Sequence, residues 1–87
     1  MNKEIPFYLC HKKVQAFKIL NLEIRMEKGR QARHFLVPVK LDLEPVEVTV
    51  EWIDKHNPQS GGYYVKYADG YTSYSPAEVF EEGYTKI

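Results

Sequence analysis

The segment Tyr63-Tyr64-Val65-Lys66-Tyr67-Ala68-Asp69-Gly70-Tyr71-Thr72-Ser73-Tyr74 decides the fold class of this chain. Two runs rich in tyrosine and other strand-forming residues flank Asp69-Gly70, a pair that favours the left-handed backbone angles of a two-residue type I′ turn. The segment therefore predicts an antiparallel β-hairpin. With a two-residue turn, Ala68 lies opposite Tyr71, Lys66 opposite Ser73, and Tyr64 opposite Ser75.

The same turn predicts which side chains share a face of the hairpin. The more apolar face, expected to pack on the core, holds Tyr63, Val65, Tyr67, Thr72 and Tyr74. The exposed face then presents Tyr64, Lys66, Tyr71 and Ser73. Two aromatic rings, an ammonium and a hydroxyl within about 5–8 Å of one another could stack a base and hold a phosphate or ribose. Ordinary packing of tyrosines on a strand surface is the alternative interpretation.

A short helix is predicted directly after the hairpin. Ser75-Pro76-Ala77-Glu78 has the form of a capping box with proline at the first helical position, and Gly83 is expected to end the helix in a left-handed cap. Tyr84 to Ile87 reads as a final strand. Ser73, Ser75 and the free amides of the helix start form a candidate anion site, unless Glu78 uses that start as a capping partner.

Upstream, residues 14–25 alternate between apolar and polar side chains, which predicts a half-buried strand. Its buried face is expected to carry Leu20, Leu22 and Ile24. Two adjacent apolar residues, Ile19 and Leu20, break the alternation as a β-bulge would. Across a polar turn containing Gly29, residues 34–39 are predicted to pair with this strand, and Pro38 marks them as an edge or as the strand end.

The middle of the chain is predicted to form a loop, a strand and a helix. Residues 40–45 read as the loop and residues 46–48 as the strand. Thr49 is expected to cap a helix over 50–56, stopped by Asn57-Pro58, with Trp52, Ile53 and His56 near one face. Residues 59–62 then connect to the hairpin. The chain is thus expected to be one α+β domain over residues 1–87, with a small antiparallel β-sheet or open barrel and two short helices.

Composition narrows the partners and the compartment. Twelve basic and twelve acidic side chains balance, so no net charge draws the chain to duplex nucleic acid or to an anionic membrane. The single cysteine, Cys10, cannot form a disulfide within the chain, which suits a reducing compartment. The sequence also lacks a signal peptide and a membrane-spanning apolar stretch. Together these features predict a cytoplasmic protein. The small core of a chain this size favours a homo-oligomer.

The charged residues indicate one further candidate binding site, and the histidines and the cysteine indicate no catalytic or metal site. Arg30, Arg33 and His34 gather at the first hairpin turn, with Lys18 and Arg25 in the preceding strand, which suits a phosphate; solvated turn charge is the alternative. The three histidines, His11, His34 and His56, are widely separated, and Cys10-His11 has no matching pair. We therefore expect no enzyme, no metal and no cofactor.

The C-terminal stretch Gly61–Ile87 resembles the ending of small proteins encoded by tailed bacteriophages and prophages. The segments 14–19 and 52–58 are also similar to that family, so the resemblance covers about two thirds of the chain. Most members of the family carry no assigned function. Small phage proteins of this size include sponges that sequester signalling nucleotides of bacterial immunity, such as cyclic oligonucleotides and cyclic ADP-ribose isomers.

The resemblance implies a phage origin, and by analogy with these sponges we expect an anti-defence protein that acts in the host cytoplasm. We expect it to bind a signalling nucleotide without catalysis, as a homo-oligomer with sites between subunits. Tyr64, Tyr71 and Trp52 would stack bases, and Lys18, Lys66 and Arg33 would meet phosphates. A protein-interaction module that inhibits a host protein or acts in phage assembly, using the same tyrosine-rich face, is the main alternative. A small nucleotide hydrolase is a third.

Overall fold

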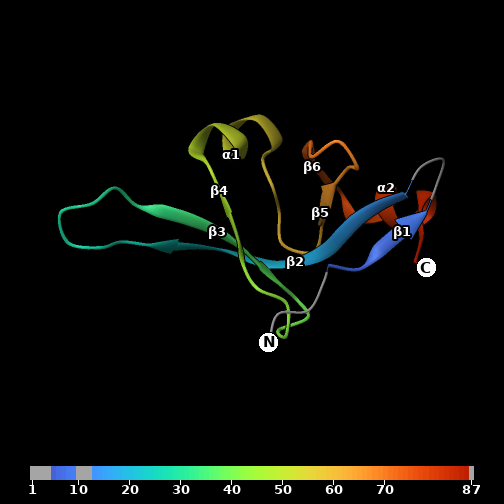
Figure 1. Cartoon of the computed structure of the whole chain (residues 1–87), viewed down its shortest axis with the longest axis horizontal. Coiled ribbons are helices and arrows are strands. Elements are labelled where there is room, and N and C mark those ends of the chain that lie inside the picture. The colour runs from blue at the N-terminus through green and yellow to red at the C-terminus, as the bar shows by residue number, and fades with distance from the viewer. Residues whose placement is uncertain (1–4, 10–12, 87) are drawn as a thin grey trace.

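The computed structural model describes residues 5–9 and 13–86, and a long central strand organises it (Figure 1). This strand, β2 (Lys13–Arg25), pairs antiparallel with three others, β1 (Phe7–Leu9), β3 (Arg33–Pro38) and β5 (Tyr63–Lys66). Beyond these neighbours lie β4 (Val46–Val48), β6 (Thr72–Ser75) and β7 (Thr85–Lys86). The two helices are α1 (Val50–His56) and α2 (Ala77–Gly83). The predicted α+β class, an antiparallel sheet with two short helices, is confirmed.

A change of partner divides β2 into two halves. Residues 13–18 pair with β1 and β5, whereas the second half pairs with β3. The register with β3 shifts between Ile19 and Asn21, which confirms the predicted β-bulge. At the bulge, the N–H of Ile19 donates to the carbonyl of Gly62 and its own carbonyl accepts from the N–H of Gly61, each over 2.8 Å.

Two buried clusters lie on opposite faces of the sheet. The cluster beneath α1 contains Phe17, Ile19, Leu36, Leu43, Val48 and Tyr64. The cluster beneath α2 contains Val14, Ala16, Tyr63, Val65 and Phe80. Neighbouring residues of one strand, such as Ala16 and Phe17, are therefore both buried, because successive side chains point to opposite faces and each face has its own helix. The first half of β2 is thus a central, doubly covered strand.

Helix α1 has the predicted ends. The hydroxyl of Thr49 accepts the N–H of Trp52 over 3.0 Å, and Asn57 ends the helix in a left-handed conformation with φ 44°. Trp52, Ile53 and His56 are half-buried, whereas the other helical side chains are exposed. The predicted buried face of this helix is confirmed.

Helix α2 forms without the predicted capping box. Pro76, in an extended conformation, occupies the cap position, and the helix begins one residue later than expected. Ser75 therefore precedes the cap position, and its hydroxyl does not cap the helix. This hydroxyl donates weakly to the carbonyl of Pro76 over 3.4 Å. Gly83 is helical and not left-handed, because Tyr84 continues directly in an extended conformation into β7.

The β5–β6 hairpin is confirmed, but its predicted register is wrong by one residue. Tyr64 lies opposite Tyr74 and Lys66 opposite Thr72, and the N–H of Tyr67 donates to the carbonyl of Tyr71. The loop is therefore three residues long, and its only positive φ lies at Gly70, 92°. A type I turn followed by a left-handed glycine has this form. This one-residue shift moves every side chain of β6 to the other face of the hairpin relative to the side chains of β5.

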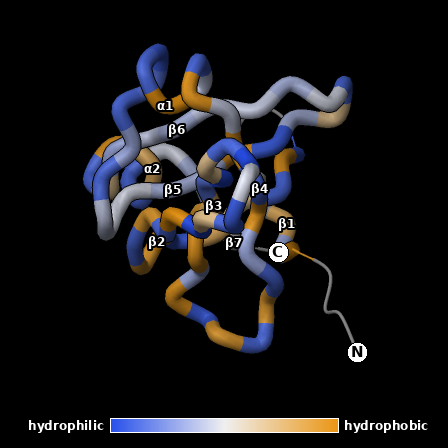
Figure 2. The backbone as a smooth tube through the Cα atoms, turned by 90° about the vertical axis from the view of Figure 1, so that its left-hand side faces the viewer, coloured by the Kyte–Doolittle hydropathy of each residue, from blue (hydrophilic) through white to orange (hydrophobic). Residues whose placement is uncertain are grey.

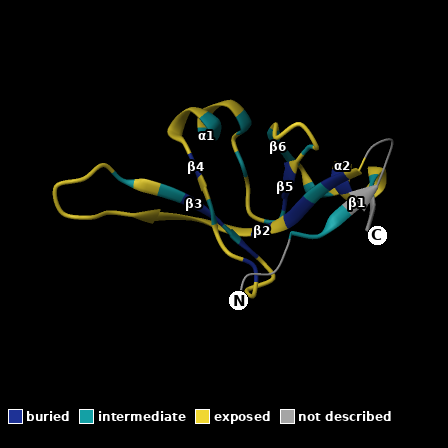
Figure 3. Ribbon diagram, in the orientation of Figure 1, coloured by how far each residue is buried: buried dark blue, intermediate teal, exposed yellow. Residues whose placement is uncertain are grey.

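The distal hairpin of β2 and β3, residues 20–34, projects from the body and is called the arm here (Figure 1). Leu20, Leu22 and Ile24 were expected to be buried, but their exposed fractions are 44%, 37% and 57%. Figure 3 shows exposed residues along most of the arm, and Figure 2 shows hydrophobic segments alternating with hydrophilic ones along the chain. The alternation is present, but no helix of the described chain covers the arm.

Candidate functional site

The predicted nucleotide-binding face of the last hairpin does not form. Tyr64 is 5% exposed and its ring stacks on Phe17, with the centroids 5.0 Å apart. Burial raises the pKa of its hydroxyl. The placement of Tyr64 on an exposed face is therefore wrong, because Tyr64 lies opposite Phe17 of β2 on the side of the sheet that α1 covers.

The other three residues of the predicted face separate. Lys66 is exposed on the side of the sheet that carries Tyr64, Ser73 lies on the opposite side with Val65, and Tyr71 precedes β6 in the hairpin loop. Tyr71 is 50% exposed, its ring lies 5.8 Å from that of Tyr67, and the Nζ atom of Lys55 lies 5.6 Å from its centroid. An aromatic and a cation thus meet at the hairpin tip, but the cation comes from α1.

Trp52 joins α1 to the hairpin. Its indole N–H donates to the hydroxyl of Thr72 over 3.0 Å, and its ring lies 6.1 Å from Tyr64 and 4.6 Å from His56. Burial, and secondarily the charge of Lys55, lower the pKa of His56. Trp52 and Tyr64 are thus brought together as predicted, but as part of the packing between helix and sheet.

The three predicted phosphate contacts lie apart. Lys18 and Lys66 are on opposite faces of the sheet, and Arg33 is on the arm. The Nζ atom of Lys18 lies 3.6 Å from a carboxylate oxygen of Glu81, which also accepts the hydroxyl of Tyr63 over 2.9 Å. Lys18 is thus engaged with α2 and does not share a site with the other two cations.

The three arginines of the arm, Arg25, Arg30 and Arg33, are paired with carboxylates. Arg33 donates two hydrogen bonds to Glu47, over 2.8 and 3.1 Å, and Arg25 donates one to Glu23 over 2.6 Å. The hydrogen bond and the charge of Glu47 raise the pKa of Arg33, and the hydrogen bond from Arg33 lowers that of Glu47. Both guanidinium groups also lie over the ring of Phe35, at 4.2 Å for Arg25 and 5.2 Å for Arg33. They shield an aromatic ring from water.

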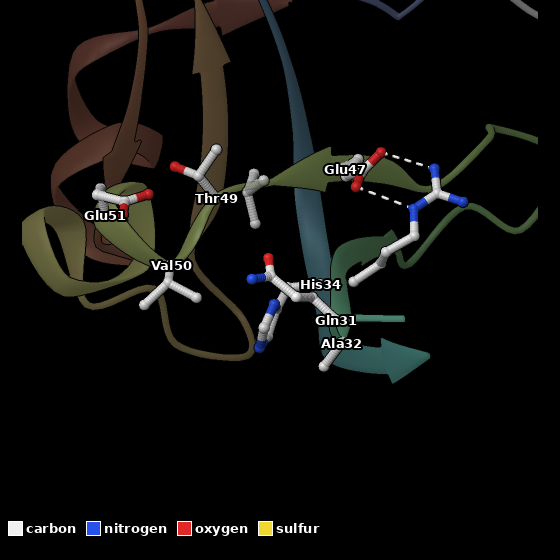
Figure 4. A pocket seen from close by; sticks show the side chains of 9 residues that line it. Gln31, Ala32, His34, Glu47, Thr49, Val50 and Glu51 are labelled. Carbon is white, nitrogen blue, oxygen red and sulfur yellow. Dashed lines mark hydrogen bonds and ion pairs between the residues drawn. The ribbon is translucent and has the colours of Figure 1, made fainter. Parts of the chain in front are cut away.

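A polar cavity of ≈ 310 Å³ lies where the start of β3, the end of β4 and the start of α1 meet (Figure 4). Arg33 and His34 are the sequence-predicted residues at its wall. The full lining is Gln31, Ala32, Arg33, His34, Glu47, Val48, Thr49, Val50 and Glu51. Sequence reasoning missed Gln31 and Glu51, since a single polar residue at the end of an element carries no pattern. Two carboxylates beside one guanidinium leave this wall without an excess of positive charge.

An apolar surface is exposed on the arm, and three of its four side chains were predicted to lie in the core. We call the side chains of Leu20, Leu22, Ile24 and Met26 the apolar strip; Met26, just past the end of β2, is 78% exposed. Leu22 lies opposite Leu36, and Ile24 opposite His34, which itself lies opposite Val48. Because opposed residues share a face, the strip continues the apolar side of the sheet beyond the part that α1 covers.

Comparison of the chain with protein-family models, with curated proteins and with solved structures finds no match. Within residues 5–9 and 13–86, no helix is long and apolar enough to cross a membrane. The same part of the chain holds no group of three or more His, Cys, Asp or Glu side chains arranged for a metal ion. Cys10 and His11 lie outside the described residues.

Proposed function

We propose that this chain is a non-catalytic interaction module that binds another protein chain through the arm. The observation that carries the proposal is the apolar strip, four large side chains of the projecting arm that are 37–78% exposed. Single exposed leucines are ordinary on protein surfaces, but a contiguous apolar patch marks a contact surface.

The other side of the arm supports the same proposal. The guanidinium group of Arg25 in β2 stacks on Phe35 of β3, and the Arg33–Glu47 pair ties β3 to β4, so side-chain contacts brace the arm. A braced hairpin loses less conformational freedom on binding than a loose one. Leucine, isoleucine and methionine on one face of the arm and arginine on the other include residue types that are enriched at protein interfaces.

The resemblance to phage proteins supplies a setting for such a module. Its partner there would be a host enzyme that it inhibits or a protein of phage assembly, and the module would act inside the host cell. Neither role needs a catalytic group, since blocking or joining surfaces is enough.

Capture from host extract by the purified, tagged chain tests the proposal. We expect one protein to co-purify with the wild-type chain and to be lost with the Leu22→Asp/Ile24→Asp variant. Val79→Asp is the matched control, because Val79 is 61% exposed on α2, away from the arm. Equal recovery with all three chains would reject the arm as the contact surface.

The polar cavity favours a second candidate, binding of a signalling nucleotide. Its volume is at the lower end of the range of small-molecule sites, and Arg33, His34 and Gln31 offer donors to a phosphate. The phosphate would replace Glu47 as the partner of Arg33. Isothermal titration against cyclic oligonucleotides and ADP-ribose isomers tests this, with Arg33→Gln expected to abolish binding and Arg30→Gln to retain it. No heat signal across the panel would reject this candidate.

A further inference from the structure

The second half of β2 has one paired edge and one open edge. Residues 21–25 pair with β3 on the first edge. On the other edge β5 reaches only to Lys18, and the hydrogen bonds of Ile19 with Gly61 and Gly62 end the contact. Within the described chain, no strand pairs with residues 21–25 on that side. The open edge lies along the arm, away from α1 and β4 (Figure 1). Such an edge is a template for another strand.

We propose that the open edge of β2 pairs antiparallel with the same edge of a second copy of this chain, with Ile24 opposite Ile24 on the two-fold axis. The inference rests on the proposed function, since it adds a second copy of this chain to the partners of the arm. In this register Leu22 of each copy lies opposite Met26 of the other, on the face of the apolar strip. On the other face Glu23 lies opposite Arg25 twice, so both ion pairs form across the dimer.

Neighbouring registers lack this complementarity. Centring the pairing on Glu23 places two carboxylates opposite each other, which is unfavourable. Centring it on Leu22 brings Arg25 opposite Ile19, whose hydrogen-bonding groups on this edge are already used by Gly61 and Gly62. If the two-fold axis lies between two residues instead of on one, each apolar side chain of one copy lies opposite a polar or charged side chain of the other. The Ile24 register alone satisfies both faces and stays clear of β5.

The proposed contact is small, so the dimer is expected to be concentration-dependent. Pairing covers residues 21–27 of each copy, and the area buried by so few residues is smaller than that of a standard stable interface. It joins two hairpins into a four-stranded sheet with a continuous apolar face. A surface of that kind extends the area available to a further partner.

Cysteine cross-linking tests the register. In a Cys10→Ser background, Ile24→Cys places two thiols on residues whose Cα atoms lie about 4.5–5.5 Å apart in an antiparallel pair, within disulfide range. Leu22→Cys is the control, because its two copies are separated by about 13 Å or more along the strands. We expect mild oxidation to link the Ile24→Cys chain and not the Leu22→Cys chain. Equal linking of both, or no linking of Ile24→Cys, overturns the register.

A charge swap tests the dimer without thiols. Glu23→Arg and Arg25→Glu each create like-charged pairs across the axis and are expected to weaken association by about tenfold, whereas the double variant restores it. Sedimentation equilibrium measures the association, and circular dichroism confirms that each variant is folded. A wild-type chain that stays monomeric at high concentration overturns the dimer. If that monomer still captures a host protein through the apolar strip, the proposed function survives without it.

Discussion

Gly62 lies in the buried segment that leads into β5, directly against the ring of Tyr74. A β-carbon at this position would fall 2.6 Å from Cζ of Tyr74 and closer still to its Cε1 and hydroxyl oxygen atoms. The same residue accepts the N–H of Ile19 at the β-bulge, so its backbone has little freedom to retreat. At this position the absence of a side chain is a packing requirement.

We therefore expect Gly62→Ala to lower the free energy of unfolding by about 1–3 kcal/mol, the usual cost of overfilling a packed site. Gly83→Ala is the control, since its added β-carbon meets nothing within 4 Å and Gly83 has no positive φ. Urea denaturation followed by the fluorescence of Trp52 measures both. Equal midpoints for the two variants would show that Tyr74 moves aside without cost.

His56 shows how packing changes the chemistry of one side chain. Its ring lies against Trp52, and burial with the nearby charge of Lys55 lowers its pKa below the ordinary value of 6.5. In the unfolded chain the same histidine takes up its proton near 6.5. Between these two pKa values the unfolded state binds more protons than the folded state. His56 therefore contributes stability above pH 6.5 that is lost as the pH falls toward its folded pKa.

We expect the wild-type chain to lose more unfolding free energy between about pH 7.5 and 5.5 than His56→Phe does. Phenylalanine keeps a ring against Trp52 but cannot titrate. Thermal melts of both chains across this range measure the difference in slope. Parallel pH profiles would show that protonated His56 is tolerated in its place beside Trp52.

Among the elements, the β5–β6 hairpin depends most on the geometry of its turn. The N–H of Gly70 donates to the carbonyl of Tyr67 over 3.0 Å, which closes a four-residue turn with Ala68 at its second position. The second position of a type I turn accepts proline, whose φ matches it. A two-residue turn at Asp69-Gly70 would instead need the backbone of Ala68 in the strand ladder.

Ala68→Pro therefore distinguishes the two turns. We expect it to be neutral or to stabilise the chain by about 0.4–1 kcal/mol, because proline restricts the unfolded state without straining the turn. Gly70→Pro is the contrast, since φ of 92° at Gly70 is closed to proline, and we expect it to destabilise the fold. Urea midpoints measure both, and a destabilised Ala68→Pro chain would contradict the three-residue loop.

The whole molecule is an elongated body, 45 × 31 × 24 Å, with the arm along its long axis (Figure 1). Both buried clusters lie in the body. Residues 25–33 include no buried side chain, so the distal arm adds surface without adding core. Stability and the proposed binding function are thus located in different parts of the chain.

This separation predicts that the arm can be shortened without unfolding the body. Replacing residues 25–33 by Asn-Gly joins Ile24 to His34, which already lie opposite each other, through a favoured two-residue turn. We expect the free energy of unfolding to change by about 1 kcal/mol or less, against a loss of about 2–5 kcal/mol for the core variant Leu36→Ala. The shortened chain should no longer dimerise. A comparable loss in both chains would place the arm within the cooperative core.

Local chemistry in the sequence determined most of the elements. Thr49 and Asn57 fix both ends of α1, because caps act through neighbouring backbone groups. The adjacent Ile19 and Leu20 marked the bulge, and the alternation of β2 marked its two faces. Three candidate sites and the phage setting were also inferred from the sequence; the setting and its nucleotide ligand remain predictions.

Only the tertiary structure decided which faces are buried and which cations are available. Tyr64 is buried because helices cover both sides of the sheet at β5, whereas Leu22 and Ile24 are exposed because no described helix packs against the arm. Glu47, fourteen residues away in the chain, took both donors of Arg33. The alternation of side chains indicates that a strand has two different faces. Whether a face is buried depends on the segment that packs against it, and this packing is set by contacts between segments distant in the sequence.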